Sequence, residues 1–166
     1  MKQLCRALVP LTAILAVLGP VEAAADIASD PLHFFDGVTE SVGTLRIVMH
    51  KVVATRSIGQ GQIKADGSLS LVQQVEDEGR PPHVRRWLIR RVAPGHFSGT
   101  MSDAAGPVTI DQVGGRYRFR FKMNVGMSVE EWLTPLRGGK SATSSMTVRK
   151  FGFAVASSQG IVRKIS

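Results

Sequence analysis

Four histidines are the first candidates for acid–base chemistry or metal binding in this chain of 166 residues. They are His33, His50, His83 and His96, and no two of them are close enough in sequence to form a local pair of metal ligands. Zinc sites usually draw their ligands from such pairs. The chain also has no Gly-x-Ser-x-Gly segment, which marks the nucleophile of many hydrolases. We therefore predict no metal, no cofactor and no catalytic residue, and hence a protein that is not an enzyme.

The acidic residues do not form a recognisable catalytic pair either. Glu76, Asp77 and Glu78 precede Gly79 and two prolines, a composition typical of an exposed turn. No pair of carboxylates stands out from the sequence in an apolar setting, where shifted pKa values would suit acid–base work. A hydrolase whose serine and histidine meet only on folding stays open as a third hypothesis.

The residues around Gly114-Gly115 predict a β-hairpin with one apolar face and one basic face. Glycine adopts positive φ without strain, so this pair suits a two-residue hairpin turn. The turn sets Asp111 opposite Arg118 and Ile110 opposite Phe119. Side chains alternate between the faces of a strand, so one face collects a row of cations: Arg116, Arg118, Arg120 and Lys122. Such a row is typical of contact with a polyanionic partner.

The N-terminus predicts export. Lys2 and Arg6 precede an apolar run from Ala7 to Leu18, and the small residues Ala23 and Ala25 follow a helix-breaking Gly-Pro pair. This order is typical of a cleaved signal peptide. The apolar run is shorter than the roughly 20 residues that a membrane span needs. We predict a signal peptide over residues 1–23 and a single domain over residues 24–166.

Export restricts the covalent chemistry and the partners of the mature protein. Its one cysteine, Cys5, lies before the apolar run, so the mature chain would have neither a disulfide nor a lipid-modified cysteine. The net charge of the whole chain is +8, and it stays strongly positive, at +7, once two cations (Lys2 and Arg6) and one acid (Glu22) are removed with the signal peptide. This charge suits an anionic membrane surface, lipopolysaccharide or a cell-wall polymer. Nucleic acid is not expected in an exported protein. The face that carries the row of cations also has no interleaved aromatic residues to stack on bases, because Tyr117, Phe119 and Phe121 point to the opposite face.

The rest of the chain predicts an all-β fold. Short alternating runs recur between turn signals, and no later segment has a helical period. Asp30 and Pro31 predict a short N-terminal helical turn that would bring Phe34 or Phe35 to one end of the fold. About nine or ten strands in one domain favour an antiparallel up-and-down barrel, since closure removes edge strands. An open sandwich is the rival architecture.

A set of short segments, in this order, resembles a family of small, uncharacterised proteobacterial envelope proteins. The segments are Phe35-Asp36-Gly37, Arg86-Trp87-Leu88-Ile89-Arg90, Gly99-Thr100-Met101-Ser102-Asp103 with Gly106, Glu131-Trp132-Leu133 and Lys150-Phe151-Gly152. The resemblance implies a lipocalin-like (calycin-like) barrel and a periplasmic or secreted location, and no activity. The chain departs from the family, whose members are often lipoproteins, in the position of Cys5. It also has Val113-Gly114-Gly115 where a Gly-Asn-Ala type segment is expected.

Residues 83–92 carry the hypothesis of an internal ligand site. If Trp87 and Ile89 point inward, Arg85 and Arg91 do so as well, whereas the other register turns Arg86 and Arg90 inward. A buried charge needs a partner, so the arginines lie at the barrel mouth, pair with acids or meet an anionic ligand.

We predict an exported, non-catalytic barrel that binds a small amphipathic or lipid-like ligand in its lumen. The predicted ligand-binding residues are Arg86, Trp87, Arg90, Phe97, Tyr117, Phe119, Phe121 and Trp132. The alternative is a structural envelope protein with a filled barrel that works through its basic outer face. A lumen of roughly 300 Å³ or more would favour the ligand binder.

Overall fold

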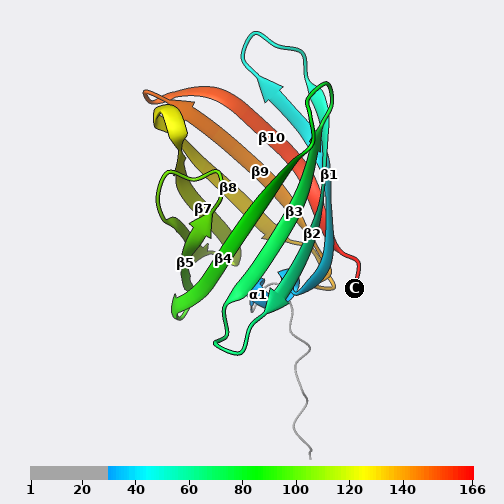
Figure 1. The fold of residues 1–166 in the computed structure, drawn as a ribbon, viewed down its shortest axis with the longest axis vertical. Coiled ribbons are helices and arrows are strands. Elements are labelled where there is room, and N and C mark those ends of the chain that lie inside the picture. Colours follow the sequence, from blue (N-terminus) through cyan, green and yellow to red (C-terminus); the bar gives the residue numbers. More distant parts are fainter. Residues whose placement is uncertain (1–29) are drawn as a thin grey trace, which may run out of the picture.

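The computed structural model describes residues 30–166, apart from the side chain of Val125. The predicted signal peptide, residues 1–23, lies outside this part of the chain. The described residues form one short helix, ten strands and a 3-10 turn (Figure 1). Their bounds are α1 Pro31–Phe35, β1 Gly37–Ile47, β2 Val53–Ile63, β3 Leu69–Asp77, β4 His83–Ala93, β5 His96–Met101, β6 Val108–Val113, β7 Arg116–Met123, η1 Asn124–Gly126, β8 Met127–Pro135, β9 Ser141–Lys150 and β10 Phe153–Lys164. Within residues 30–166, no helix has the length and apolar character needed to cross a membrane.

The strands form a closed antiparallel barrel. Each pairs with its neighbours in sequence, and β1 also pairs with β10, which closes the ring. Closure leaves no sheet edge open to other chains. The predicted up-and-down barrel is therefore confirmed, and the open sandwich is not formed.

Two hairpins have the predicted registers. Asp111 pairs with Arg118 and Ile110 with Phe119 between β6 and β7. Ile63 pairs with Leu69 between β2 and β3, across a loop in which Gly67 has a φ of 77°. In both hairpins the glycine-containing turn sets which residues face each other, because the side-chain period of a strand is two.

The helix α1 closes one end of the barrel (Figure 1). Asp30 caps it, accepting a hydrogen bond of 2.9 Å from the Leu32 backbone N–H. Lys164 of β10 donates to the carbonyls of His33 and Asp36 at 2.8 and 2.6 Å, which satisfies acceptors at the helix C-terminus. A Cβ atom at Gly61 of β2 would collide with the Phe35 carbonyl oxygen, so glycine is needed for the helix to lie this close.

The tightest part of the core lies beside this helix. Phe34 is buried, as predicted for one of the two phenylalanines, and Phe35 is buried as well. The Tyr117 and Phe97 rings meet edge-on at 6.4 Å. The most completely buried large side chains are Pro31, Leu69, Val108, Ile110 and Tyr117. The plugged end is therefore solid, and the free space lies between it and the opposite rim.

Candidate functional site: the barrel lumen

The lumen holds a cavity of about 520 Å³. Phe35 of α1 lies at its closed end, and its lining reaches the exposed Arg80 and His83 at the opposite rim. Most of the wall is apolar, with Leu71, Met101 and Val129 among the lining residues. This volume is within the range of small-molecule sites. The barrel is therefore not filled with side chains, and the alternative of a filled lumen is wrong.

One polar contact crosses the wall between β4 and the turn after β5. The Arg85 Nε donates to a carboxylate oxygen of Asp103 at 2.9 Å, and both side chains line the cavity. Burial alone would raise the pKa of Asp103, but hydrogen bonds from Ser102 and Arg85 outweigh it and lower the pKa below its ordinary value. Asp103 is thus held as a carboxylate. The two terminal nitrogens of Arg85 have no hydrogen-bond partner among the described residues.

A second polar contact joins β8 and β9. The Ser144 hydroxyl donates to the Glu131 carboxyl at 2.6 Å, and both residues line the cavity. The Glu131 side chain keeps some accessible surface because it faces the cavity. It nevertheless lies deep in the barrel, where the surrounding protein separates its carboxyl from bulk solvent. Burial raises its pKa, and the Ser144 hydrogen bond and the Arg85 charge only partly oppose this effect. Glu131 therefore holds its proton more strongly than an exposed carboxyl would.

A third contact fixes the orientation of an aromatic side chain in the wall. The Trp87 Nε1 donates to the Gln73 side-chain oxygen at 2.6 Å. The indole also meets the Phe121 ring edge-on at 6.1 Å. We name the six residues of these contacts the polar strip: Gln73, Arg85, Trp87, Asp103, Glu131 and Ser144. Their polar atoms provide donors and acceptors in a lumen whose wall is mainly apolar.

The structure divides the predicted ligand-binding residues into three groups. Trp87, Phe119 and Phe121 line the cavity as expected. Phe97 and Tyr117 point inward but are packed in the solid core beside α1, so they do not line the free space.

Arg86, Arg90 and Trp132 lie on the outer wall, so their predicted placement in the lumen is wrong. Arg86 and Arg90 are exposed because they alternate with the inward-facing Trp87 and Ile89. Trp132 lies between the inward-facing Glu131 and Leu133 and for the same reason points out.

The sequence-based selection missed Arg85 and Glu131. The alternation itself could have found Arg85, because it is two residues from Trp87 and shares its face. Choosing the apolar Val129 and Leu133 as inward-facing would likewise have turned Glu131 inward.

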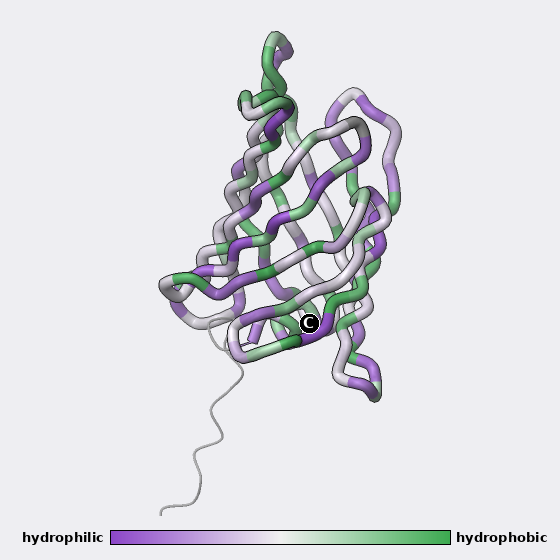
Figure 2. The backbone as a smooth tube through the Cα atoms, turned by 90° about the vertical axis from the view of Figure 1, so that its left-hand side faces the viewer, coloured by the Kyte–Doolittle hydropathy of each residue, from purple (hydrophilic) through white to green (hydrophobic). Residues whose placement is uncertain are grey.

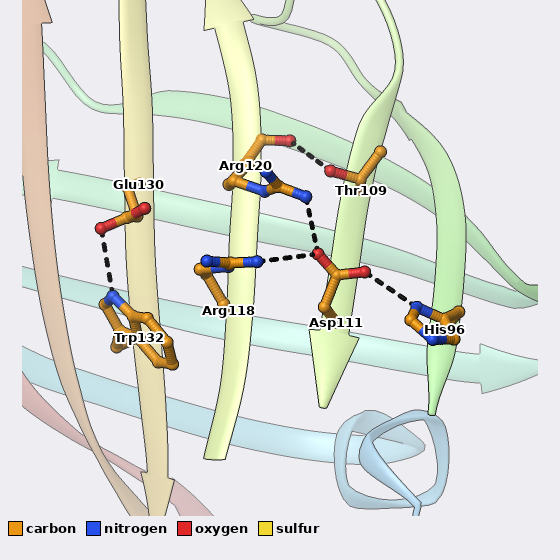
Figure 3. A network of polar contacts seen from close by, with 7 residues as sticks. All are labelled: His96, Thr109, Asp111, Arg118, Arg120, Glu130 and Trp132. Atoms are coloured by element: carbon orange, nitrogen blue, oxygen red, sulfur yellow. Dashed lines mark hydrogen bonds and ion pairs between the residues drawn. The ribbon is translucent and has the colours of Figure 1, made fainter. Parts of the chain in front are cut away.

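The predicted basic row lies on the outer wall of β7, and Figure 3 shows two of its members, Arg118 and Arg120, with their partner Asp111. Asp111 accepts from Arg120 at 2.8 Å, lies 3.5 Å from Arg118, and is 2.9 Å from the His96 ring nitrogen. The His96 hydrogen bond lowers the pKa of Asp111, and the Arg120 contact adds to this against the effect of burial. Arg118 and Arg120 thus share one acidic partner within the wall.

Trp132 is the other partner of this row. The Arg116 guanidinium lies 4.4 Å and that of Arg118 5.6 Å from the centre of the Trp132 ring. Cations over an indole face are attracted by its electrons. Glu130 accepts a hydrogen bond from the indole N–H at 3.2 Å. Lys122, the last member of the row, is exposed near the open end. An anionic surface contact through the row stays a prediction.

The closed ten-stranded barrel and its internal cavity give this protein a lipocalin-like, or calycin-like, fold. Among solved structures, the S-type phycobiliprotein lyase CPES from Guillardia theta is similar, with a TM-score of 0.65 over 86% of this chain and 94% of that one. The two sequences are only 9% identical, so the likeness concerns the fold. A scan of family models finds no match to the sequence, and a search of curated proteins finds none either.

This comparison contradicts the prediction that the protein is not an enzyme, because a barrel of the same fold belongs to a protein named as a lyase. The prediction rested on missing sequence motifs. That is a poor basis, since active sites are assembled from residues that are distant in sequence and are recognised by geometry. Within residues 30–166 no three side chains of the metal-binding types gather into a group.

Proposed function

We propose that this protein binds a small amphipathic molecule in its lumen, with an apolar body in the aromatic wall and an anionic or hydrogen-bond-accepting end at the polar strip. The cavity of about 520 Å³ carries this proposal. Binding sites of this size usually combine a mainly apolar lining with a few well-placed polar groups that fix the ligand's orientation. The lining here has that composition.

Arg85 is the residue that selects the polar end of the ligand. Its Nε is engaged by Asp103, which fixes the guanidinium plane, and its terminal nitrogens remain as donors toward the cavity. A carboxylate or phosphate accepts two parallel hydrogen bonds from such a group. Burial raises the pKa of Glu131, so this carboxyl opposes an anionic ligand less than an exposed glutamate would.

Affinity for an amphipathic probe tests the site. A dansyl-labelled fatty acid should bind the protein, and Arg85→Gln should weaken its binding about tenfold or more, because hydrogen bonds to a charged group contribute about 1.5–3 kcal/mol. Arg86→Gln is the matched control, since it removes the same charge from the next residue on the outer wall. Equal losses in both variants, or no binding to the unaltered protein, would rule out the lumen site.

We also propose that the protein is exported by cleavage after Ala23 and works at the bacterial cell envelope. The charged, apolar and small-residue segments of the N-terminus support this, as does the resemblance to envelope proteins. Native mass spectrometry of protein purified from its own cells tests both proposals together. The chain mass reports whether residues 1–23 are removed, and an added mass that Arg85→Gln abolishes reports the bound molecule.

A further inference from the structure

Two neighbouring tips at the open end of the barrel expose large apolar side chains. The β1–β2 loop exposes Val48 by 56% and Met49 by 97%, and the β9–β10 turn exposes Phe151 by 83% and Phe153 by 77%. Both tips lie opposite α1 (Figure 1), and the Val48 N–H donates to the Val155 carbonyl, which joins their bases. The topmost tip in Figure 2, the β1–β2 loop, is largely in the hydrophobic colour. We name these four residues the apolar rim.

Neither packing nor turn geometry explains why large apolar residues occupy these two tips. Met49 has a φ of 63° and Phe151 a φ of 51°, and no other described non-glycine residue has a positive φ. Glycine and asparagine adopt this conformation far more readily than a bulky side chain. Their exposure means that Met49 and Phe151 recover little by contact with the core. The rim therefore keeps large apolar groups at unfavourable positions, where they face solvent.

The ionisable residues of the two tips are all basic. Residues 46–52 contain Arg46, His50 and Lys51, and residues 149–153 contain Arg149 and Lys150, without any aspartate or glutamate. A groove on the adjacent outer wall adds Arg120 and Lys122 beside Arg149, with Glu130 as its one acid. The next turn around the rim, between β3 and β4, holds the acidic residues 76–78. The tips that carry the apolar rim are therefore basic without any acid, whereas the β3–β4 turn combines its three acids with Arg80.

We propose that the apolar rim docks on the surface of an anionic lipid bilayer. The apolar side chains would enter the interface between headgroups and acyl chains, while the surrounding cations meet the negative headgroups. Separate protruding tips suit a bilayer, which deforms around them. A second copy of this chain would bring two sets of like charges together, so self-association does not fit the same surface. This inference goes beyond ligand binding and holds whether or not the lumen is occupied.

Docking in this orientation turns the mouth of the cavity toward the membrane. Ile47 and Val155 line the cavity and directly adjoin the two tips. A lipid-like molecule would then pass between bilayer and lumen without crossing open water. The acidic β3–β4 turn would lie at the margin of the contact, where its charge limits how far that side approaches.

Vesicle co-sedimentation tests the docking. The mature protein should bind vesicles of phosphatidylglycerol and phosphatidylcholine, bind pure phosphatidylcholine vesicles more weakly, and dissociate as salt is raised. Met49→Asn with Phe151→Asn should weaken partitioning onto the anionic vesicles about tenfold or more. Asparagine tolerates positive φ, so the unfolding temperature of this variant should stay the same or rise.

The matched control is Val113→Asn with Leu136→Asn, which removes two exposed apolar side chains at the plugged end. It should leave vesicle binding unchanged. Two outcomes overturn the proposal: binding that survives the rim variant but is lost with Arg116→Gln and Arg120→Gln, or a dimer in solution that the rim variant abolishes. The first assigns the contact to the β7 wall, and the second assigns the rim to self-association.

Discussion

Replacing Glu131 by glutamine should make the barrel more stable, and the gain should grow with pH. The ordinary pKa of a glutamate side chain is about 4.5, and burial raises that of Glu131 in the folded protein. Between these two pKa values the folded state holds a proton that the unfolded state has lost. Unfolding free energy therefore falls as pH rises, by at most about 1.4 kcal/mol per pH unit for one proton. Glutamine does not titrate, so the Glu131→Gln variant does not lose this unfolding free energy as pH rises.

The surroundings of Glu131 favour glutamine as the test. The Ser144 hydroxyl can donate to the amide oxygen of glutamine as it does to the carboxyl, so the contact across β8 and β9 persists. Arg85 is the charged group that opposes the raised pKa, and Asp103 pairs with that arginine. The pKa values of Asp103 and Asp111 are lowered instead. Their stabilisation is lost only as pH falls below about 4, outside the window in which Glu131 acts.

Urea unfolding followed by tryptophan fluorescence measures this effect. The difference in unfolding free energy between Glu131→Gln and the unaltered protein should be constant below about pH 4.5 and increase above it, until the folded pKa is passed. Glu130→Gln is the control, because its carboxyl lies on the outer wall and its removal relieves no burial. A difference that stays flat from about pH 4 to about pH 8 would refute the reasoning. Arg85 would then stabilise a charged Glu131, and the polar strip would carry a second negative charge.

Two further predictions concern the plugged end and the outer wall of the barrel. Gly61→Ala should lower the unfolding free energy by about 2–4 kcal/mol, because its Cβ atom collides with the Phe35 carbonyl and displaces α1. Gly67→Ala, which meets open space but has a φ of 77°, should lower it by only about 1 kcal/mol, and equal losses in thermal unfolding would contradict the close-approach argument. Asp111→Ala should lower the unfolding free energy by about 1 kcal/mol and leave Arg118 and Arg120 to repel each other, so that added salt restores part of the loss. If added salt leaves the unfolding free energy of Asp111→Ala unchanged, repulsion between Arg118 and Arg120 does not destabilise the barrel when Asp111 is absent.

The fold could be predicted because its signals are local. A glycine pair or an Asp-Gly loop sets the register of a hairpin, and alternation then assigns each side chain to a face. The β6–β7 and β2–β3 hairpins follow this logic residue by residue. The helix cap at Asp30 is also a local signal. Closure of the barrel depends on pairing between β1 and β10, which are distant in sequence, so it has no local signal and is predicted only from the number of strands.

The site could be predicted only in part, because β4 is ambiguous when taken alone. Both of its faces carry arginine, and composition cannot tell which arginine has a partner inside. Asp103 stabilises Arg85, but it follows β5, and only the pairing of the folded barrel brings the two together. Placing Arg86 and Arg90 beside Trp87 in one lumen also conflicted with alternation, which puts neighbouring residues on opposite faces. Trp132 was misplaced for the same reason.

The two ends of the barrel differ in a way that bears on function. At the plugged end, α1 is held by β10 through Lys164 and by β2 through the hydrogen bond from Ile63 to Asp36. At the open end, two bulky residues remain exposed at positive φ. Stability is therefore concentrated where the lumen is closed, and the open end keeps features that stability alone would remove. Any molecule that reaches the polar strip must pass that open end, so ligand exchange and membrane contact would share one rim.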